Sequence, residues 1–127
     1  MLKTFDSIAT IAVKDIAAAK HFYEEILGFD AADPGQEGVL AYTSGNSKML
    51  VYKSEYAGTN QATATTWAVD DVDAEAAALK AKGVKFEHYD FPGGKREGDV
   101  HVFGPVRNAW FRDPDGNILS IVNRHGG

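Results

Sequence analysis

The sequence predicts an α+β fold in which a unit of one strand, one helix and three further strands occurs twice. Three observations support this. Two alanine-rich stretches each follow an apolar, β-branched stretch and begin at an aspartate. The order of elements repeats with an offset of about 56 residues. Finally, Asp113-Pro114-Asp115-Gly116-Asn117 separates two apolar runs, as a tight hairpin turn would.

The first unit is expected to span about residues 5–55. A strand over Ile8–Val13 precedes Asp15, which stands at the N-cap position of a helix. The helix should end at Leu27-Gly28-Phe29, and Phe29 should open a short strand that Asp33-Pro34-Gly35 breaks. The helix presents an apolar stripe formed by Ala19, Phe22, Tyr23 and Ile26. Two more strands follow the helix, over Val39–Thr43 and Lys48–Lys53.

The second unit is expected to span about residues 62–123, after a polar connection over Tyr56–Gln61. Its helix begins at Asp71 or Asp73 and stops at Gly83. The predicted helix stripe is Ala74, Ala77, Ala78 and Ala81, flanked by Val72 and Leu79. The predicted strands are Ala64–Val69, Val84–Tyr89, Val100–Phe103, Val106–Arg112 and Asn117–Val122. An exposed loop is expected over Phe91–Gly98, and its part from Pro92 onward is interpreted as a solvated connection or, alternatively, as a lid over the cavity.

Composition limits the possible classes of protein. The 127 residues suffice for one domain, which we expect to cover residues 1–127. The chain has no cysteine, so disulfides and thiolate metal sites are excluded. A formal charge of -5 argues against nucleic acid as a partner, and no apolar run is long enough to span a membrane. Without a visible signal peptide, we expect a cytoplasmic protein.

Several short motifs, taken in order and at their spacing, carry a resemblance to a known family. They span about residues 7–123 and are Ile11-Ala12-Val13-Lys14-Asp15, Phe22-Tyr23, Leu27-Gly28-Phe29, Val69-Asp70-Asp71-Val72, Lys82-Gly83-Val84 and Phe111-Arg112-Asp113-Pro114-Asp115-Gly116-Asn117. In these motifs the chain resembles the vicinal oxygen chelate superfamily, the group of glyoxalase I, bleomycin-resistance proteins and extradiol dioxygenases. The resemblance implies two βαβββ modules that form a curved mixed sheet around a cavity, and a homodimer.

The resemblance also implies a divalent metal, and there the sequence departs from the family. The positions that would carry its ligands fall on Ile8, near Ala64 and on Ser120. A divalent cation needs several imidazole, carboxylate or other strong donors. Isoleucine and alanine supply none, and a neutral hydroxyl is a poor one. We therefore expect no metal at the family's position and no cofactor.

The histidines offer an alternative metal site. His88 lies near a strand end and His101 within a short strand, and strand alternation can point either of them inward. Glu87, Asp90 and Asp99 lie nearby in the sequence. A scattered histidine is more often structural, as we expect for His21 in the first helix and His125 in the tail. A relocated site at His88 and His101 is the less favoured interpretation.

The strand faces toward the cavity should carry small, apolar and hydroxyl side chains. That lining suits an organic molecule with few hydrogen bonds. The residues proposed to bind it are Ile8, Thr10, Tyr42, Tyr52, Thr66, His101, Trp110 and Ser120, with Ala12, Ala64 and Ala68 beside them. Aromatic strand residues are more often part of a core, and for Trp67 we prefer that interpretation. Asp113 and Asp115 are interpreted as turn residues.

Three functions stay open at this stage. The favoured one is metal-independent binding of a small organic molecule. The second is an enzyme of the lyase, isomerase or dioxygenase kind. It would use a metal at His88 and His101 or, without metal, His101 or Tyr42 as acid or base. The third is a structural or regulatory protein whose cavity is filled by its own side chains.

Overall fold

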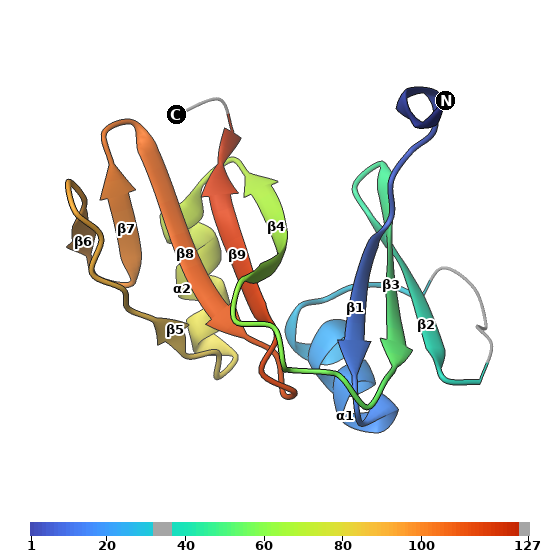
Figure 1. Cartoon of the computed structure of the whole chain (residues 1–127). Helices are drawn as coiled ribbons and strands as arrows, with labels where there is room; N and C mark the ends of the chain where they lie inside the picture. The colour runs from blue at the N-terminus through green and yellow to red at the C-terminus, as the bar shows by residue number, and fades with distance from the viewer. Residues whose placement is uncertain (32–36, 125–127) are drawn as a thin grey trace. The chain divides into compact units, whose positions relative to one another are not determined.

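The computed structural model describes residues 1–31 and 37–124. The chain divides into two compact units (Figure 1). Unit 1 comprises Met1–Asn60 and Pro114–Asn117, and unit 2 comprises Gln61–Asp113 with the residues from Ile118 onward. The α+β class predicted from the sequence is confirmed, while the expectation of a single domain stays a prediction.

Unit 1 contains a three-stranded sheet in the order β1-β3-β2. Strand β1 runs parallel to β3, and β2 runs antiparallel to it. Their bounds are Ala9–Val13 for β1, Val39–Ser44 for β2 and Ser47–Lys53 for β3, and a short 3₁₀ turn, η1, covers Leu2–Thr4. In place of the strand expected at Phe29 there is one isolated bridge between Ala31 and Tyr42. Asp33-Pro34-Gly35, which was expected to break that strand, lies outside the described residues.

The helix of unit 1 begins as predicted and changes type midway. Helix α1 covers Ile16–Lys20, and its Asp15 cap accepts a hydrogen bond from the backbone N–H of Ala18 at 3.1 Å. It continues as a π-helix, η2, over His21–Ile26. The predicted stripe faces the sheet, since Ala19, Phe22 and Tyr23 are buried.

Unit 2 contains a sheet in the order β4-β9-β8-β7-β6, and β5 pairs with β8. Strands β4 and β9 are parallel, and the other pairs are antiparallel. The elements are β4 (Thr63–Val69), α2 (Val72–Ala81), β5 (Phe86–Glu87), β6 (Lys95–Glu97), β7 (Val100–Phe103), β8 (Val106–Arg112) and β9 (Ile118–Asn123). Two predictions were inexact. The strand expected over residues 84–89 is only β5, and the exposed loop expected over residues 91–98 contains β6.

The predicted apolar stripe of α2 was wrong. The helix buries Val72 and Ala76 and half-buries Leu79, while Ala74, Ala77 and Ala78 are exposed. At about 3.6 residues per turn, Ala74, Ala77, Ala78 and Ala81 do share one side of the helix, but Val72, Ala76 and Leu79 share the opposite side. The larger Val72 and Leu79 determine which face packs, because they bury more apolar area. Asp71 caps the helix as expected, with Ala74 donating to its carboxylate at 3.0 Å.

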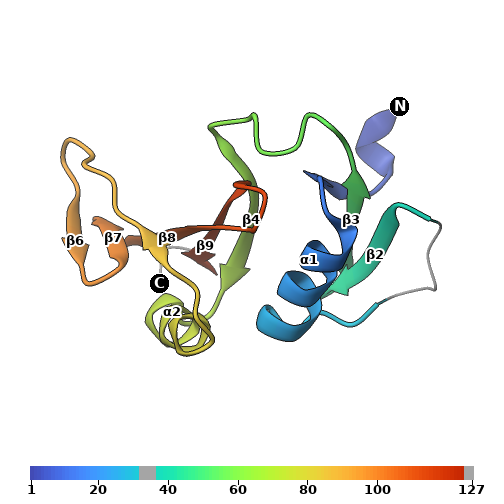
Figure 2. The same cartoon turned by 90° about the horizontal axis from the view of Figure 1, so that it is seen from below.

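Each sheet has a helix on one face only (Figure 2). In unit 1, Ile11, Val13, Met49 and Val51 face the helix and are buried. In unit 2, Ala109, Phe111, Leu119 and Ile121 do the same, and Trp67 stacks on Phe111 as expected. We call the opposite face of each sheet its open face. Strand alternation places every second side chain there.

The Asp-Pro-Asp-Gly-Asn segment forms the predicted turn between β8 and β9. Gly116 adopts a φ of 91° there, which favours glycine. The side-chain amide of Asn117 donates to the backbone carbonyl of Ala12 at 2.7 Å. A Cβ at Gly58 would clash with the carbonyl oxygen of Asp115, so the turn also requires glycine at that neighbouring position. These contacts give Asn117 and Gly58 a structural role.

Candidate functional site

Five ring side chains gather on the open face of unit 2, and we call them the aromatic cluster. They are Tyr89, Phe91, His101, Phe103 and Trp110. The His101 and Trp110 ring centroids lie 4.9 Å apart, at an interplanar angle of 80°. Phe91 contacts four of these rings, with centroid distances between 5.4 and 5.9 Å. Edge-to-face contacts at such distances are favourable and fix the orientation of each ring.

Strand register explains how these rings come together. His101 and Phe103 are two residues apart on β7 and so share a face. His101 pairs with Asn108 of β8, and Trp110 lies two residues further along that strand. Tyr89 and Phe91 come from the segment between β5 and β6, which crosses the same face. At Gly94 an added Cβ would lie 2.5 Å from the Phe103 ring, so glycine there allows the ring to pack against the backbone.

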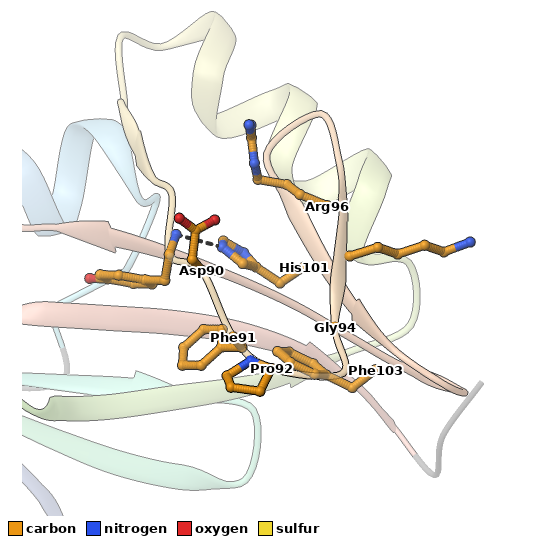
Figure 3. Close-up of a pocket in the computed structure, with 9 residues that line it drawn as sticks. Asp90, Phe91, Pro92, Gly94, Arg96, His101 and Phe103 are labelled. Atoms are coloured by element: carbon orange, nitrogen blue, oxygen red, sulfur yellow. Dashed lines mark hydrogen bonds between the residues drawn. The ribbon is translucent and has the colours of Figure 1, made fainter.

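The aromatic cluster borders a partly open pocket of about 320 Å³ within unit 2. Figure 3 shows Phe91, Pro92 and Phe103 on one side of His101, and Asp90 and Arg96 on the other. The remaining lining residues are Tyr89, Gly94 and Lys95. One wall is therefore aromatic and apolar, while the other carries charges of both signs. Such a pocket suits a small organic molecule with a flat apolar part.

His101 is the buried polar residue of the pocket, with 2% of its surface exposed. Its Nε2 accepts a hydrogen bond from the backbone N–H of Tyr89 at 2.9 Å (Figure 3). An Nε2 that accepts must be unprotonated, so the proton of the neutral ring lies on Nδ1. Burial lowers the pKa of His101 below its ordinary value, because desolvation penalises the imidazolium. The backbone of Asn108 opposes this shift without reversing it, while the N–H of Tyr89, which donates to Nε2, favours the neutral ring.

His88 belongs to a charged network at the edge of the same region. Its Nε2 lies 2.8 Å from Asp99, and its Nδ1 lies 3.1 Å from a guanidinium nitrogen of Arg96. Lys80 also contacts Asp99, at 3.2 Å. The hydrogen bond with His88, together with Lys80, lowers the pKa of Asp99. Both nitrogens of His88 thus already have partners.

The residues do not fit the relocated metal site that was the alternative interpretation. Within residues 1–31 and 37–124, no group of three or more His, Asp or Glu side chains is arranged to hold a metal ion. His101 directs Nε2 to a backbone amide and His88 pairs with Asp99 and Arg96. The expectation that the family's ligand positions fall on Ile8, near Ala64 and on Ser120 stays a prediction from the resemblance.

Four of the predicted binding residues lie close together on the open face of unit 2. Ser120 pairs with Trp110 on one side and with Thr66 on the other. The hydroxyls of Thr66 and Ser120 lie 2.6 Å apart, and Ser120 is buried. Trp110 contacts His101 through its ring and donates its indole N–H to Thr63 at 3.1 Å. Binding by these residues stays a prediction.

The other predicted residues lie in unit 1 and do not form one site. Thr10 and Tyr52 lie on its open face, where Tyr52 is 38% exposed. Ile8 borders a separate, partly open pocket of about 430 Å³, with Asp6, Ser7, Asn46, Ser47 and Lys48. Tyr42 points the other way. It is fully buried against Tyr23 and Phe29, and its hydroxyl donates to Glu24 at 3.0 Å. Because Tyr42 pairs with Met49, it belongs to the helix side of the sheet, contrary to the cavity-facing orientation expected.

Sequence reasoning missed Tyr89, Phe91 and Phe103. A signal was present, since Tyr89 and Phe91, like His101 and Phe103, are separated by one residue. That spacing places both members of each pair on one face of an extended chain. The interpretation of residues 91–98 as an exposed loop accounts for the omission of Phe91, but not for that of Tyr89 and Phe103, which lay in predicted strands.

The comparisons with known proteins identify the family. The model of the Glyoxalase/Bleomycin resistance protein/Dioxygenase superfamily matches residues 4–121. The chain belongs to this superfamily, as its motifs indicated. A comparison with curated proteins finds no match. No helix in the described part of the chain is long and apolar enough to cross a membrane.

Solved structures support the same fold. An antibiotic-binding protein from Streptomyces sp. CB03234, TnmS3, is 25% identical, with a TM-score of 0.63 and coverage of 94% of this chain and 96% of that one. A glyoxalase/bleomycin resistance protein from the same organism is 27% identical, with a TM-score of 0.61 and coverage of 92% and 98%. A lactoylglutathione lyase from Agrobacterium tumefaciens is 15% identical, with a TM-score of 0.68 and coverage of 95% and 94%, and shows the fold alone.

Proposed function

We propose that this chain binds a small organic molecule at the pocket of unit 2, without a metal ion. The observation that carries the proposal is the aromatic wall around His101 in a pocket of about 320 Å³. Rings whose faces and edges border an accessible space bind flat apolar molecules by dispersion and by exclusion of water. The charged rim would orient a polar substituent.

The electrostatics of the pocket favour an uncharged contact at its centre. His101 is neutral at ordinary pH, because its pKa is lowered by burial. Asp90 places a negative charge at the rim, and Lys95 and Arg96 place positive ones there. Arg96 is held in part by His88 and by the backbone carbonyl of Gly98, which restricts its motion. A flat molecule with one polar substituent matches this distribution.

The relatives support binding rather than a particular reaction. One similar structure is that of an antibiotic-binding protein, and we extend the idea of organic-ligand binding to this chain as a proposal. An enzyme that uses His88 or His101 is the alternative. A homodimeric assembly and a cytoplasmic location, both expected from the sequence, also stay predictions. Light scattering coupled to size exclusion would test the assembly.

The test is a thermal-shift screen with two sets of molecules of matched size, one planar and aromatic and one aliphatic. We expect aromatic molecules to raise the melting temperature in proportion to the logarithm of their concentration, and divalent metals to leave it unchanged. Removing the ring with Phe103→Ala should abolish the aromatic effect. Tyr56→Ala is the matched control, because Tyr56 is an exposed ring of unit 1.

Two outcomes would contradict the proposal. One is a melting temperature that rises with a divalent metal and stoichiometric metal in protein purified without a histidine tag. The other is an aromatic effect that Phe103→Ala and Tyr56→Ala reduce equally, because binding would then be nonspecific. Conversion of a bound molecule, followed by mass spectrometry, would instead favour the enzyme alternative.

A further inference from the structure

The hydrogen bond between Tyr89 and His101 connects the pocket's aromatic wall to the sheet. The segment from His88 to Gly94 joins β5 to β6 and carries Tyr89, Phe91 and Pro92. Its backbone N–H at Tyr89 donates to Nε2 of His101 on β7 at 2.9 Å. Figure 3 shows this bond at the point where the segment begins to cross the open face. The aromatic wall therefore takes its position partly from an imidazole nitrogen.

We propose that His101 is a positioning residue of the pocket and that its unprotonated Nε2 holds the Tyr89 segment in place. Protonation of His101 then releases the aromatic wall of the pocket and weakens ligand binding. The effect on binding rests on the function proposed above. The coupling between His101 and the Tyr89 segment does not, because it can be measured without a ligand.

The chemistry follows from the number of lone pairs on an imidazole. Neutral His101 carries one N–H, on Nδ1, and one lone pair, on Nε2, which accepts from Tyr89. A proton from solvent would occupy that lone pair and turn Nε2 into a second donor. Two N–H groups would then face each other at 2.9 Å, which is repulsive. Either the ring or the Tyr89 segment must move to relieve this.

The backbone of Asn108 favours the protonated ring but does not reverse the effect of burial, and within the described part of the chain the buried Nδ1 makes no regular hydrogen bond that would compensate. The ring is enclosed by Trp110, Tyr89 and Phe91, so it has little room to rotate. The segment lies at the surface, where Phe91 is 41% exposed. We therefore expect the segment, rather than the ring, to move.

The ionisable groups around His101 influence the pH at which it becomes protonated. His88 and Arg96 are positively charged or can become so, and both disfavour a further proton on His101. Asp90 is an exposed carboxylate that lines the same pocket. Tyr89 and Lys95 complete the set on the pocket side, and β8 contributes the uncharged Asn108 and Trp110. Burial dominates and lowers the pKa of His101, so the change falls below pH 6.5.

The test is an NMR titration of the unliganded protein from pH 8 downward. Nitrogen shifts of the His101 ring should show the Nδ1–H tautomer at high pH, then protonation at a midpoint below 6.5. The amide signal of Tyr89 should move with the same midpoint, and its hydrogen exchange should accelerate below it. A Tyr89 amide that stays unchanged while His101 titrates would overturn the proposal.

Matched variants separate this role from general packing. In His101→Gln the side-chain carbonyl can still accept from Tyr89 but does not titrate, so the acid-induced change should disappear. In His101→Phe the ring remains without an acceptor, so Tyr89 should exchange rapidly at every pH. His88→Gln removes the neighbouring exposed imidazole and should leave the transition in place. Persistence of the transition in His101→Gln would contradict the proposal.

The consequence for binding is measured with 2-naphthol, a flat aromatic probe that stays uncharged from pH 5 to 8. Its affinity should fall about five-fold or more below the His101 midpoint, the effect expected for loss of one buried hydrogen bond. This loss should be absent in His101→Gln. If 2-naphthol does not bind at any pH but the NMR transition occurs, the proposed function fails for this probe and the positioning role stands. If binding occurs without pH dependence, the positioning role fails instead.

Discussion

The two units place their aromatic rings differently. In unit 1, Phe22, Tyr23 and Tyr42 lie between the helix and the sheet and are buried. Unit 2 has such a layer as well, with Trp67, Phe86 and Phe111, but adds the aromatic cluster on its open face. Unit 1 thus shows that a helix and a sheet of this kind need only one layer of rings. The second layer in unit 2 is in excess of that requirement, which is why we assign it to binding.

The largest loss of stability among the variants that test this difference should come from Tyr23→Ala in unit 1. Tyr23 is fully buried, so its truncation should lower the free energy of unfolding by about 3–5 kcal/mol, as for other large-to-small changes in a core. Phe91→Ala on the open face of unit 2 should cost less than about 1 kcal/mol, because the ring is partly exposed. Urea denaturation of both variants measures the difference. Equal costs would mean that the aromatic cluster is a second core.

A smaller loss should follow from Tyr42→Phe. This change removes the hydroxyl that donates to Glu24 and should cost about 2 kcal/mol, since the acceptor is charged. Burial and Glu24 raise the pKa of Tyr42 well above 10, so the folded state keeps this proton where the unfolded state loses it. Stability should therefore fall as the pH rises above about 10, and less so in Tyr42→Phe. Tyr52→Phe, on the open face, is the control and should change neither quantity.

The helix caps Asp15 and Asp71 should contribute about equally to the free energy of unfolding. Asp15→Ala and Asp71→Ala each remove an acceptor of one backbone hydrogen bond and should cost about 1 kcal/mol. Asp15→Asn and Asp71→Asn keep an acceptor at the same position and should restore most of the loss. Thermal unfolding of the four variants provides the measurement. A much larger loss in one unit would show that its helix depends more on local capping than on ring packing.

The smallest effect on stability, and the most local one, is expected for Gly94→Ala. Its Cβ would displace the Phe103 ring, which can shift, so the cost should stay below about 1 kcal/mol. The NMR signals of Phe103 should change, and the affinity for 2-naphthol should fall. Gly93→Ala has open space at its Cβ but a φ of 79°, so it should destabilise by about 1 kcal/mol without moving Phe103. If both variants leave the Phe103 signals unchanged, the contact between Gly94 and this ring is not what shapes the pocket.

Local sequence rules predicted much of the fold. The two aspartate caps and the Asp-Pro-Asp-Gly turn were correct, because each depends on residues within one turn. The stripe of α2 was wrong because its four alanines share one side of the helix, whereas the larger Val72 and Leu79 lie on the opposite side, and that is the side that packs. The segment around β6 was misassigned because its glycines and charges are typical of a loop, although pairing with β7 makes it a strand.

For the candidate site, the sequence identified individual residues but not their arrangement. Trp110, Ser120, Thr66 and His101 do share the open face of unit 2, as strand alternation indicated. Tyr42 faces the helix instead, since the parity of β2 could not be decided from its own residues. Only the pairing of Tyr42 with Met49 shows which face of the sheet the Tyr42 side chain occupies.

By itself, the sequence determined the class of fold and the family. These are properties of residue type and short-range spacing. Only the tertiary structure determined that Tyr89 and Phe91 meet Phe103 and Trp110, and that His101 accepts a hydrogen bond from the Tyr89 backbone. Such contacts join residues from different strands, and their formation depends on the register of β7 and β8, which no short stretch of sequence specifies.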